Sequence, residues 1–508
     1  MRSSIRRHPA SVATAVAFTV VALGAVLVRF WDLSSQPGGL YPDEAAEGVD
    51  ARRLITDPSF HPVFFDNDGG REALFAYMAA TAFRLAGASV TTLRGTAAAV
   101  GVIGAVLIWF AVRRYGRLVA LAAMAWAAGS LWLIAVSRDG FRCILVVPVG
   151  ALALAALLRW SDRPGRLTAV LAGAATGLGL WTYQPLKLLP VLTVVWLLWI
   201  RRSDAGRFAR MRSTLPWHIG AYVVVAGPMI WTAITDTRNY FARGVTSLFD
   251  IGSAAPPHSV PLHVLKTIGM FLVTGDPNER HNVNALPLLG PLLFIPFALG
   301  VWRIWRRRDD PAYALLLLGL VVFFLAPLLA LEGGAPHFLR SLGLAPYIAA
   351  AIGLGCVELV RLARRIPTEW TGMASPRRTA AAATGVCAIA LVLIGAISFR
   401  TYLARPVEQR YDPYSFADVQ LAAAARGGPG TAVIVADYDA LDVRFLDAAD
   451  PPTIVNPAQH IANAAVFSLI VAPTRADIAH SVGPSFAARA RAAAVDPRGK
   501  PVVWEVVP

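Results

Sequence analysis

Residues 311–331, which read PAYALLLLGLVVFFLAPLLAL, decide the fold class of this chain because they contain no charged side chain. A helix of roughly 20 apolar residues is long enough to cross the hydrocarbon core of a bilayer. The whole chain has 508 residues, of which 56% are apolar and only 16% are charged. This composition excludes a soluble multidomain protein. The chain is therefore expected to be a polytopic α-helical membrane protein.

Ten further apolar segments flank this one, so we predict about eleven transmembrane helices. They cover residues 10–28, 93–112, 118–136, 142–159, 167–182, 186–200, 215–233, 287–305, 311–331, 341–360 and 379–399. No small-x-small cleavage site follows the first segment, which favours a retained anchor over a cleaved signal peptide. The three cysteines, Cys143, Cys356 and Cys387, lie in apolar stretches and are expected to serve packing.

The basic residues set the expected orientation. The formal net charge is +15, but the cations alternate with the apolar segments instead of forming one patch, which argues against nucleic acid as a partner. Connectors and ends on one side hold 23 of the 47 Lys and Arg, within residues 2–7, 113–117, 159–166, 201–212, 303–308 and 361–378. The positive-inside rule makes this side cytoplasmic. The N-terminus is then expected inside the cell and the C-terminus outside.

The opposite side carries two long loops, residues 29–92 and 234–286, and a C-terminal tail. Residues 1–399 are interpreted as the membrane domain and residues 400–508 as a small soluble α/β domain outside the cytoplasm. Short β-like runs at 431–436, 465–471 and 501–507 alternate with helical patterns in the tail. The tail has no Gly-rich phosphate loop, so nucleotide binding is not expected there.

The segment Leu40-Tyr-Pro-Asp-Glu-Ala-Ala-Glu-Gly-Val-Asp50 places adjacent carboxylates just beyond the first predicted span. Asp43 and Glu44 follow Pro42, which favours the first position of a helix, and acids in a first turn are stabilised by the helix dipole. Two capping acids on a surface helix would explain the pair. An enzyme working at the outer face of a membrane would place its base at the same point, and cations expected on this side favour that interpretation.

Five cations and two histidines fall on the predicted outer side. A single Arg at the end of a span is more often an interfacial anchor than a ligand. A carboxylate base beside clustered guanidinium groups, however, suits a reaction in which a phosphate leaves and an acceptor hydroxyl loses its proton. The candidates are Arg138, Arg142, Lys187, Arg280 and Arg340, with His281 and His337 beside two of them.

Together these motifs resemble glycosyltransferase family 39, which includes protein O-mannosyltransferases and lipid A aminoarabinose transferases, within the C superfamily of integral-membrane glycosyltransferases (GT-C). The resemblance covers roughly residues 10–360 and lies in the order of the motifs. They are Tyr41-Pro-Asp-Glu44, Ser137-Arg-Asp-Gly-Phe-Arg142, Gly177-Leu-Gly-Leu-Trp-Thr-Tyr183 with Leu189-Pro190, Gly275-Asp-Pro-Asn-Glu-Arg-His-Asn282 and Pro336-His-Phe-Leu-Arg340.

The resemblance implies inverting transfer of a sugar from a polyprenyl-phosphate donor to an acceptor lipid, glycan or protein in the cell envelope. Asp43 would be the general base and Glu44 its neighbour in the acidic motif. Arg138 and Arg142 would hold the donor phosphate, and the looser motifs add Arg280, His281, His337 and Arg340. Asp139 departs from the small or apolar residue expected there; it is a second acidic group or a loop residue, and we favour the latter.

No cofactor is expected, and the sequence shows no convincing metal site. Some GT-C enzymes need a divalent ion, and Asp43 and Glu44 would then be its ligands. Two other functions remain open. A secondary transporter is also polytopic, but it tends to show repeated halves and ionisable groups near the midplane of the bilayer. A lipid-linked sugar ligase or flippase is closer in chemistry.

Overall fold

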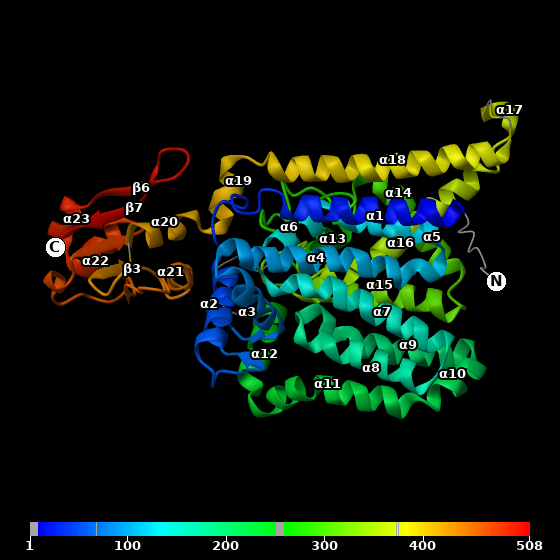
Figure 1. The fold of residues 1–508 in the computed structure, drawn as a ribbon, viewed down its shortest axis with the longest axis horizontal. Helices are drawn as coiled ribbons and strands as arrows, with labels where there is room; N and C mark the ends of the chain where they lie inside the picture. Colours follow the sequence, from blue (N-terminus) through cyan, green and yellow to red (C-terminus); the bar gives the residue numbers. More distant parts are fainter. Residues whose placement is uncertain (1–8, 68, 250–258, 372, 374, 426) are drawn as a thin grey trace, which may run out of the picture.

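The computed structural model describes residues 9–67, 69–249, 259–371, 373, 375–425 and 427–508. Long helices lie side by side in one bundle, and a small α/β unit is attached at one end of it (Figure 1). The long helices are α1 (Pro9–Phe30), α4 (Val90–Val112), α5 (Arg117–Gly129), α6 (Leu131–Arg138), α7 (Val146–Asp162), α8 (Arg166–Leu178), α9 (Leu189–Ser203), α11 (Leu215–Thr235), α14 (Gly290–Arg306), α15 (Pro311–Leu329), α16 (Ala345–Ala363) and α18 (Pro376–Leu403).

The prediction of a polytopic helical membrane protein is confirmed, but the count of eleven spans is reduced. Each expected segment coincides with a helix, yet among the described residues only eight helices are long and apolar enough to cross a membrane. A ninth span results if α5 and α6, which meet at 54°, are counted as one. The two predicted spans that this count leaves out correspond to α8, which has 13 residues, and α14, which has 17. A 3₁₀ turn at Gly179–Trp181 follows α8, and Arg303 and Arg306 end α14.

The basic connectors meet at one end of the bundle, as their predicted common side requires. Arg114 pairs with Asp162 at 2.8 Å across two of these connectors. The Trp199 indole donates to the carbonyl of Arg308 at 3.0 Å, which joins two more. The short helices α10 (Ala205–Arg212) and α17 (Thr368–Thr371) lie at this end (Figure 1). Arg2, Arg6 and Arg7 lie outside the described residues.

The opposite end of the bundle carries the two long loops, which fold into short helices and a two-stranded ribbon. The first loop forms α2 (Pro42–Thr56), β1 (Phe64–Phe65), β2 (Arg71–Glu72) and α3 (Leu74–Ala86). The second contains α12 (Thr237–Phe249) and α13 (Val260–Gly269). Although α2 is polar in sequence, most of it is buried, including all four of its carboxylates, Asp43, Glu44, Glu47 and Asp50. Such burial is costly unless the charges are paired.

Residues 404–508 form the α/β unit, whose five-stranded sheet has the order β4-β3-β5-β7-β6. Strand β3 is parallel to β4 and β5, whereas β7 is antiparallel to β5 and β6. The expected runs at 431 and 501 are strands, but the run at 465 begins with a turn and becomes a strand only at Leu469. The short strands β4 and β6 were not predicted. The elements are α19 (Val407–Tyr411), α20 (Phe416–Ala425), β3 (Thr431–Ile434), α21 (Ala440–Leu446), β4 (Thr453–Val455), β5 (Leu469–Ala472), α22 (Arg475–Val482), α23 (Pro484–Arg489), β6 (Arg491–Val495) and β7 (Pro501–Val506).

Helix α21 docks this unit against α2. The ring of Phe445 stacks on Phe83 of α3 with centroids 6.0 Å apart, and it belongs to the main apolar core of the bundle. A Cβ atom at Gly48 would lie 2.5 Å from this ring, so the close approach of α21 to α2 requires glycine there. The division into domains at residue 400 stays a prediction, because the α/β unit and the bundle share a packed surface.

Candidate active site

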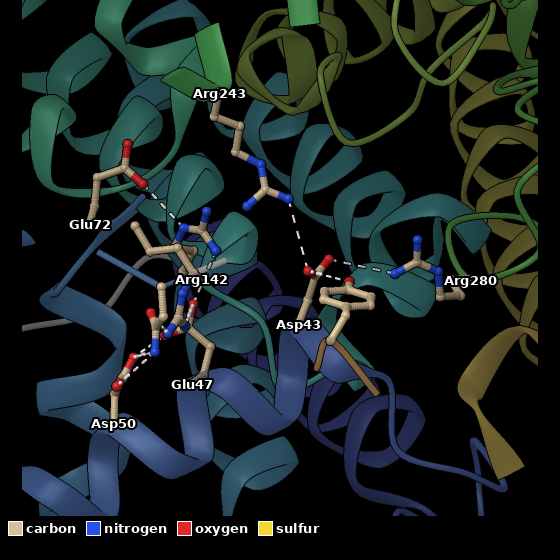
Figure 2. Close-up of polar contacts among 10 residues, drawn as sticks. Asp43, Glu47, Asp50, Glu72, Arg142, Arg243 and Arg280 are labelled. Carbon is tan, nitrogen blue, oxygen red and sulfur yellow. Dashed lines mark hydrogen bonds and ion pairs between the residues drawn. The ribbon is translucent and has the colours of Figure 1, made fainter. Parts of the chain in front are cut away.

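Asp43 lies in the first turn of α2, where three segments distant in sequence converge on it (Figure 2). Its Oδ1 accepts a hydrogen bond from the Tyr438 hydroxyl at 2.9 Å and lies 3.9 Å from Nη2 of Arg243. Its Oδ2 lies 3.8 Å from Nη1 of Arg280. The Arg280 guanidinium covers the ring of Tyr41, 3.4 Å from its centroid. Asp43 is 7% exposed, so it is largely shielded from water but is not locked into a short ion pair.

The charges around Asp43 keep it ionised. Burial acts to raise its pKa, but Arg243, Arg280 and Arg142 together with the Tyr438 hydroxyl lower it below the ordinary value for aspartate. The carboxylate borders a small cavity, where it can accept a proton from a bound hydroxyl. The cavity is lined by Tyr41, Asp43, Glu44, Asp139, Phe141, Arg280, His281 and Leu339.

Glu44, the second member of the predicted acidic pair, is fully engaged by the protein. Arg94 of α4 donates to both of its oxygens, from Nε at 2.8 Å and from Nη2 at 3.0 Å. The amide of Gly140 donates to the same carboxylate at 2.8 Å. Arg94 in turn donates to the carbonyls of Pro37 and Gly39. The structure therefore brings Glu44 next to Asp43 but uses it to hold two loops on α4.

A buried ionic network occupies the middle of α2, beside the Asp43 site (Figure 2). Arg142 lies between Glu47 and Glu72, at 3.2 Å and 3.1 Å, and is 1% exposed. Lys187 reaches the other oxygen of Glu72 at 3.1 Å and is part-exposed. Arg71 contacts Glu47 at 3.3 Å and also pairs with Asp50. Arg142, predicted to hold the donor phosphate, and Lys187, a further candidate on the outer side, are thus held by protein carboxylates.

Two other predicted arginines, Arg138 and Arg340, also donate hydrogen bonds to groups of the protein. Arg138, which is fully buried, donates to backbone carbonyls at and beyond the C-terminus of α1, including Arg29 at 3.1 Å and Gln36 at 3.1 Å. Arg340 donates to the Glu332 carboxylate at 2.8 Å and to the Glu332 carbonyl. These contacts hold the outer ends of helices to neighbouring backbone inside the protein.

Asp139 lines the cavity with Asp43, but its pKa shifts in the opposite direction. Burial raises the pKa of Asp139 well above its usual range, and the carboxylate of Glu44 raises it further against the opposing effect of Arg94 and Arg280. Its Oδ1 has no hydrogen-bond partner among the described residues. The pKa of Asp43 is therefore lowered while that of Asp139 is raised, and such a separation is typical of paired acid and base roles.

The histidines lie beside this cavity in a group that could bind a metal. Ligand atoms of Asp276, His281 and His337 lie within 4.8 Å of one another, the one such group among the described residues. Burial is the main cause that lowers the pKa of both histidines, so both are neutral, as metal ligands must be. Asp276 already accepts from the Phe338 amide at 2.6 Å and from His281 Nδ1 at 3.1 Å. These hydrogen bonds join two loops, so the three residues also have a structural role.

Sequence reasoning missed two residues that contact Asp43. Arg243 was placed in the second outer loop but was not assigned to the site, because no local motif surrounds it. Tyr438 lies in the C-terminal unit, outside the range of the family resemblance. Only the tertiary fold brings either residue to the first turn of α2.

Comparison with known proteins places this site in a recognised architecture. Residues 72–231 match the family model described as dolichyl-phosphate-mannose-protein mannosyltransferase, and no curated protein sequence matches. Structures of ArnT from Cupriavidus metallidurans are similar over nearly the whole chain. The undecaprenyl phosphate complex gives a TM-score of 0.65 at 13% identity and covers 97% of each chain, and the apo state gives 0.62 at 14% and covers 98% of each.

A second similar fold is the archaeal oligosaccharyltransferase AglB from Archaeoglobus fulgidus, in complex with an inhibitory peptide and a dolichol-phosphate. Its TM-score is 0.57 at 13% identity, over 92% of this chain and 71% of that one. These identities are low enough that the structures establish the fold alone. The expected resemblance is confirmed at the level of the fold: this chain is a polytopic membrane protein that shares the fold of ArnT and AglB, and its residues 72–231 match the mannosyltransferase family model.

Proposed function

We propose that this protein transfers a sugar from a polyprenyl-phosphate donor to an acceptor hydroxyl, with Asp43 as the general base. The observation that carries the proposal is the state of Asp43. It is a buried, ionised carboxylate that borders a cavity and stays 3.8–3.9 Å from two guanidinium groups. The family match does not reach Asp43, so its role rests on this geometry.

The chemistry that follows is a single displacement. The acceptor oxygen attacks the anomeric carbon while its proton passes to Asp43, and the bond to the donor phosphate breaks on the opposite face of the sugar. The configuration inverts, and polyprenyl phosphate leaves with the bonding electrons. Arg280 and Arg243 are the cations nearest to Asp43, and guanidinium groups suit the negative charge that develops on a leaving phosphate. The raised pKa of Asp139 favours its protonated form, which can donate a hydrogen bond to the sugar or the acceptor.

The donor class is supported by the proteins with similar folds. ArnT was solved with undecaprenyl phosphate and AglB with a dolichol-phosphate, and the matching family is named for a dolichyl-phosphate-mannose donor. Each of these three names includes a long-chain isoprenoid phosphate. The sugar and the acceptor differ among them, so we assign only the shared donor chemistry to this chain.

The decisive experiment supplies purified protein in lipid vesicles with a panel of polyprenyl-phosphate sugars and added acceptors. We expect a new glycosidic bond with inverted configuration for at least one donor, and loss of product with Asp43→Asn. A flippase or secondary transporter would instead move a substrate across vesicles without forming a bond. Movement without product across the panel would overturn the proposal.

The site is proposed to face the outside of the cytoplasmic membrane, with the N-terminus in the cytoplasm. Ser59 in the first loop and Ser203, the last residue of α9, are both exposed and lie at opposite ends of the bundle. In a background in which Cys143, Cys356 and Cys387 are replaced by alanine, Ser59→Cys should react with a membrane-impermeant thiol reagent in intact cells. Ser203→Cys should react only after the membrane is permeabilised. The reverse pattern would contradict this orientation.

A further inference from the structure

Tyr438 joins the C-terminal α/β unit to the proposed base. It follows β3, at the carboxyl end of the parallel part of the sheet, and lies two residues before α21. Its hydroxyl donates to Asp43 Oδ1 at 2.9 Å, and its ring packs edge-on against Tyr41, with centroids 6.2 Å apart. The carboxyl ends of parallel strands are where α/β units commonly present functional side chains.

The position of Tyr438 is fixed by the docking of α21 on α2. Phe445 stacks on Phe83, fills the space over Gly48 and lies beneath the guanidinium of Arg52 at 5.0 Å. Phe445 is 1% exposed, so this contact is part of the packed core. The α/β unit therefore cannot shift along α2 without leaving a cavity, and Tyr438, which is 39% exposed, lies in the turn that leads into the docked helix α21.

The hydrogen bond from Tyr438 gives the two carboxylate oxygens of Asp43 different roles. The terminal torsion of an aspartate is broad, so an unrestrained carboxylate would rotate or collapse onto a neighbouring guanidinium. Arg243 and Arg280 are close enough to attract it but stay 3.9 Å and 3.8 Å away. A phenol hydroxyl that donates to Oδ1 opposes both movements and leaves Oδ2 to accept a proton.

We infer that Tyr438 is a positioning residue, contributed by the C-terminal unit, that orients the Asp43 carboxylate toward the acceptor hydroxyl. This inference rests on the proposed function and adds to it a role for residues 404–508. The bundle alone then lacks a complete site, since one of the hydrogen bonds on its base comes from the other unit.

The test is Tyr438→Phe, which removes one oxygen and keeps the ring. We expect kcat to fall by about ten-fold, the size of one lost hydrogen bond to a charged group, with KM for the donor unchanged. The acid limb of the pH profile should move to higher pH, because losing a donor to the carboxylate raises the pKa of Asp43. Tyr411→Phe is the matched control: it removes a phenol oxygen from the same unit, and we expect parental kinetics.

The pH profile must be compared between variants because several other groups face Asp43. They are Arg243 from α12, Asp139 and Arg142 from the segment between α6 and α7, Glu44 from α2, and Arg280 and His281 from the loop before α14. All of them are unchanged in Tyr438→Phe. A shift specific to this variant therefore reports the hydroxyl, whereas a lower kcat with an unmoved profile would mean that Tyr438 only packs, and would overturn the inference.

A second variant covers the case in which Tyr438→Phe does not fold. Phe445→Ala loosens the docking of α21 without touching Asp43, and it should lower kcat and move the acid limb in the same direction. Parental kinetics in Phe445→Ala would overturn the inference in that case. Failure of the proposed function looks different: Asp43→Asn would then keep its turnover. If Asp43→Asn is inactive and Tyr438→Phe is parental, only the role of Tyr438 falls.

Discussion

Asp43 and Glu47 lie one turn apart on α2, are both buried, and have opposite environments. Glu47 is wedged between Arg71 and Arg142 at 3.3 Å and 3.2 Å, whereas Asp43 meets its two guanidinium groups at 3.8–3.9 Å and receives one hydrogen bond from a phenol. Burial raises the pKa of Glu47 in spite of its partners, while the surrounding cations lower that of Asp43. The ion-pair distances at Asp43 are longer than those at Glu47. This difference distinguishes a carboxylate that stabilises the fold from the proposed base.

The strongest way to break this comparison is to remove the charge of Asp43. Asp43→Asn should reduce turnover by about 100-fold or more, the typical contribution of a general base, while folding stays intact. Product formation and thermal unfolding of the detergent-solubilised protein measure the two effects. Near-normal turnover would remove Asp43 from the mechanism.

The network around Glu47 should respond in the opposite way. Glu47→Gln removes the carboxylate that Arg142 and Arg71 share, although Glu72 and Asp50 remain as their partners, so we expect destabilisation of about 1–3 kcal/mol. Thermal unfolding should show a clear loss, with any remaining folded protein still active. Asp57→Asn, which removes the exposed partner of Arg53, is the control and should melt like the parent. A stable but inactive Glu47→Gln would place Glu47 in the chemistry.

Arg280 and Arg138 were both predicted to bind the donor phosphate, and replacing each one tests whether it contacts the substrate or stabilises the fold. Arg280→Lys keeps the charge but loses the planar fork, and it should weaken donor binding by about ten-fold. Arg138→Lys should lower thermal stability and leave donor affinity unchanged, because Arg138 donates to backbone carbonyls. Titration of each variant with a polyprenyl phosphate separates these results, and the reverse pattern would return Arg138 to the donor site.

The smallest expected effect is that of chelation. We propose that transfer needs no bound metal ion, because Glu44 is occupied by Arg94 and Asp43 faces guanidinium groups that repel a cation. Turnover after treatment with EDTA should match that of the untreated enzyme. A loss that an added divalent cation restores would refute this, and His337→Gln would then show whether the group with Asp276 and His281 is the binding site.

The sequence predicted the parts of this molecule that depend on local composition. The apolar segments became helices, and Asp43 was selected as a candidate because it lies beyond the first span in a motif of adjacent acidic residues. The length of α8 and α14 was less predictable, because apolar flanks such as Gly179–Trp181 continue as turns instead of helix.

The partners of each charged residue could not be predicted, since pairing depends on distances across the fold. Arg138 and Arg142 have the residue type and side of the membrane expected of phosphate ligands. Only the tertiary structure shows that one caps α1 and the other bridges Glu47 and Glu72. Arg243 and Tyr438 were missed for the same reason, because nothing near them in sequence points to Asp43.

The separation of Asp43 and Tyr438 by 395 positions sets an order for the maturation of this protein. The chain grows from its N-terminus, and domains generally fold as they emerge. Glu44 can meet Arg94 and Gly140 as soon as the first few helices have inserted, so the scaffold of α2 forms early. The phenol reaches the carboxylate only after α18 has inserted and β3 and α21 have folded. The Asp43 carboxylate is therefore synthesised early, and it receives the hydrogen bond from Tyr438 only near the end of synthesis.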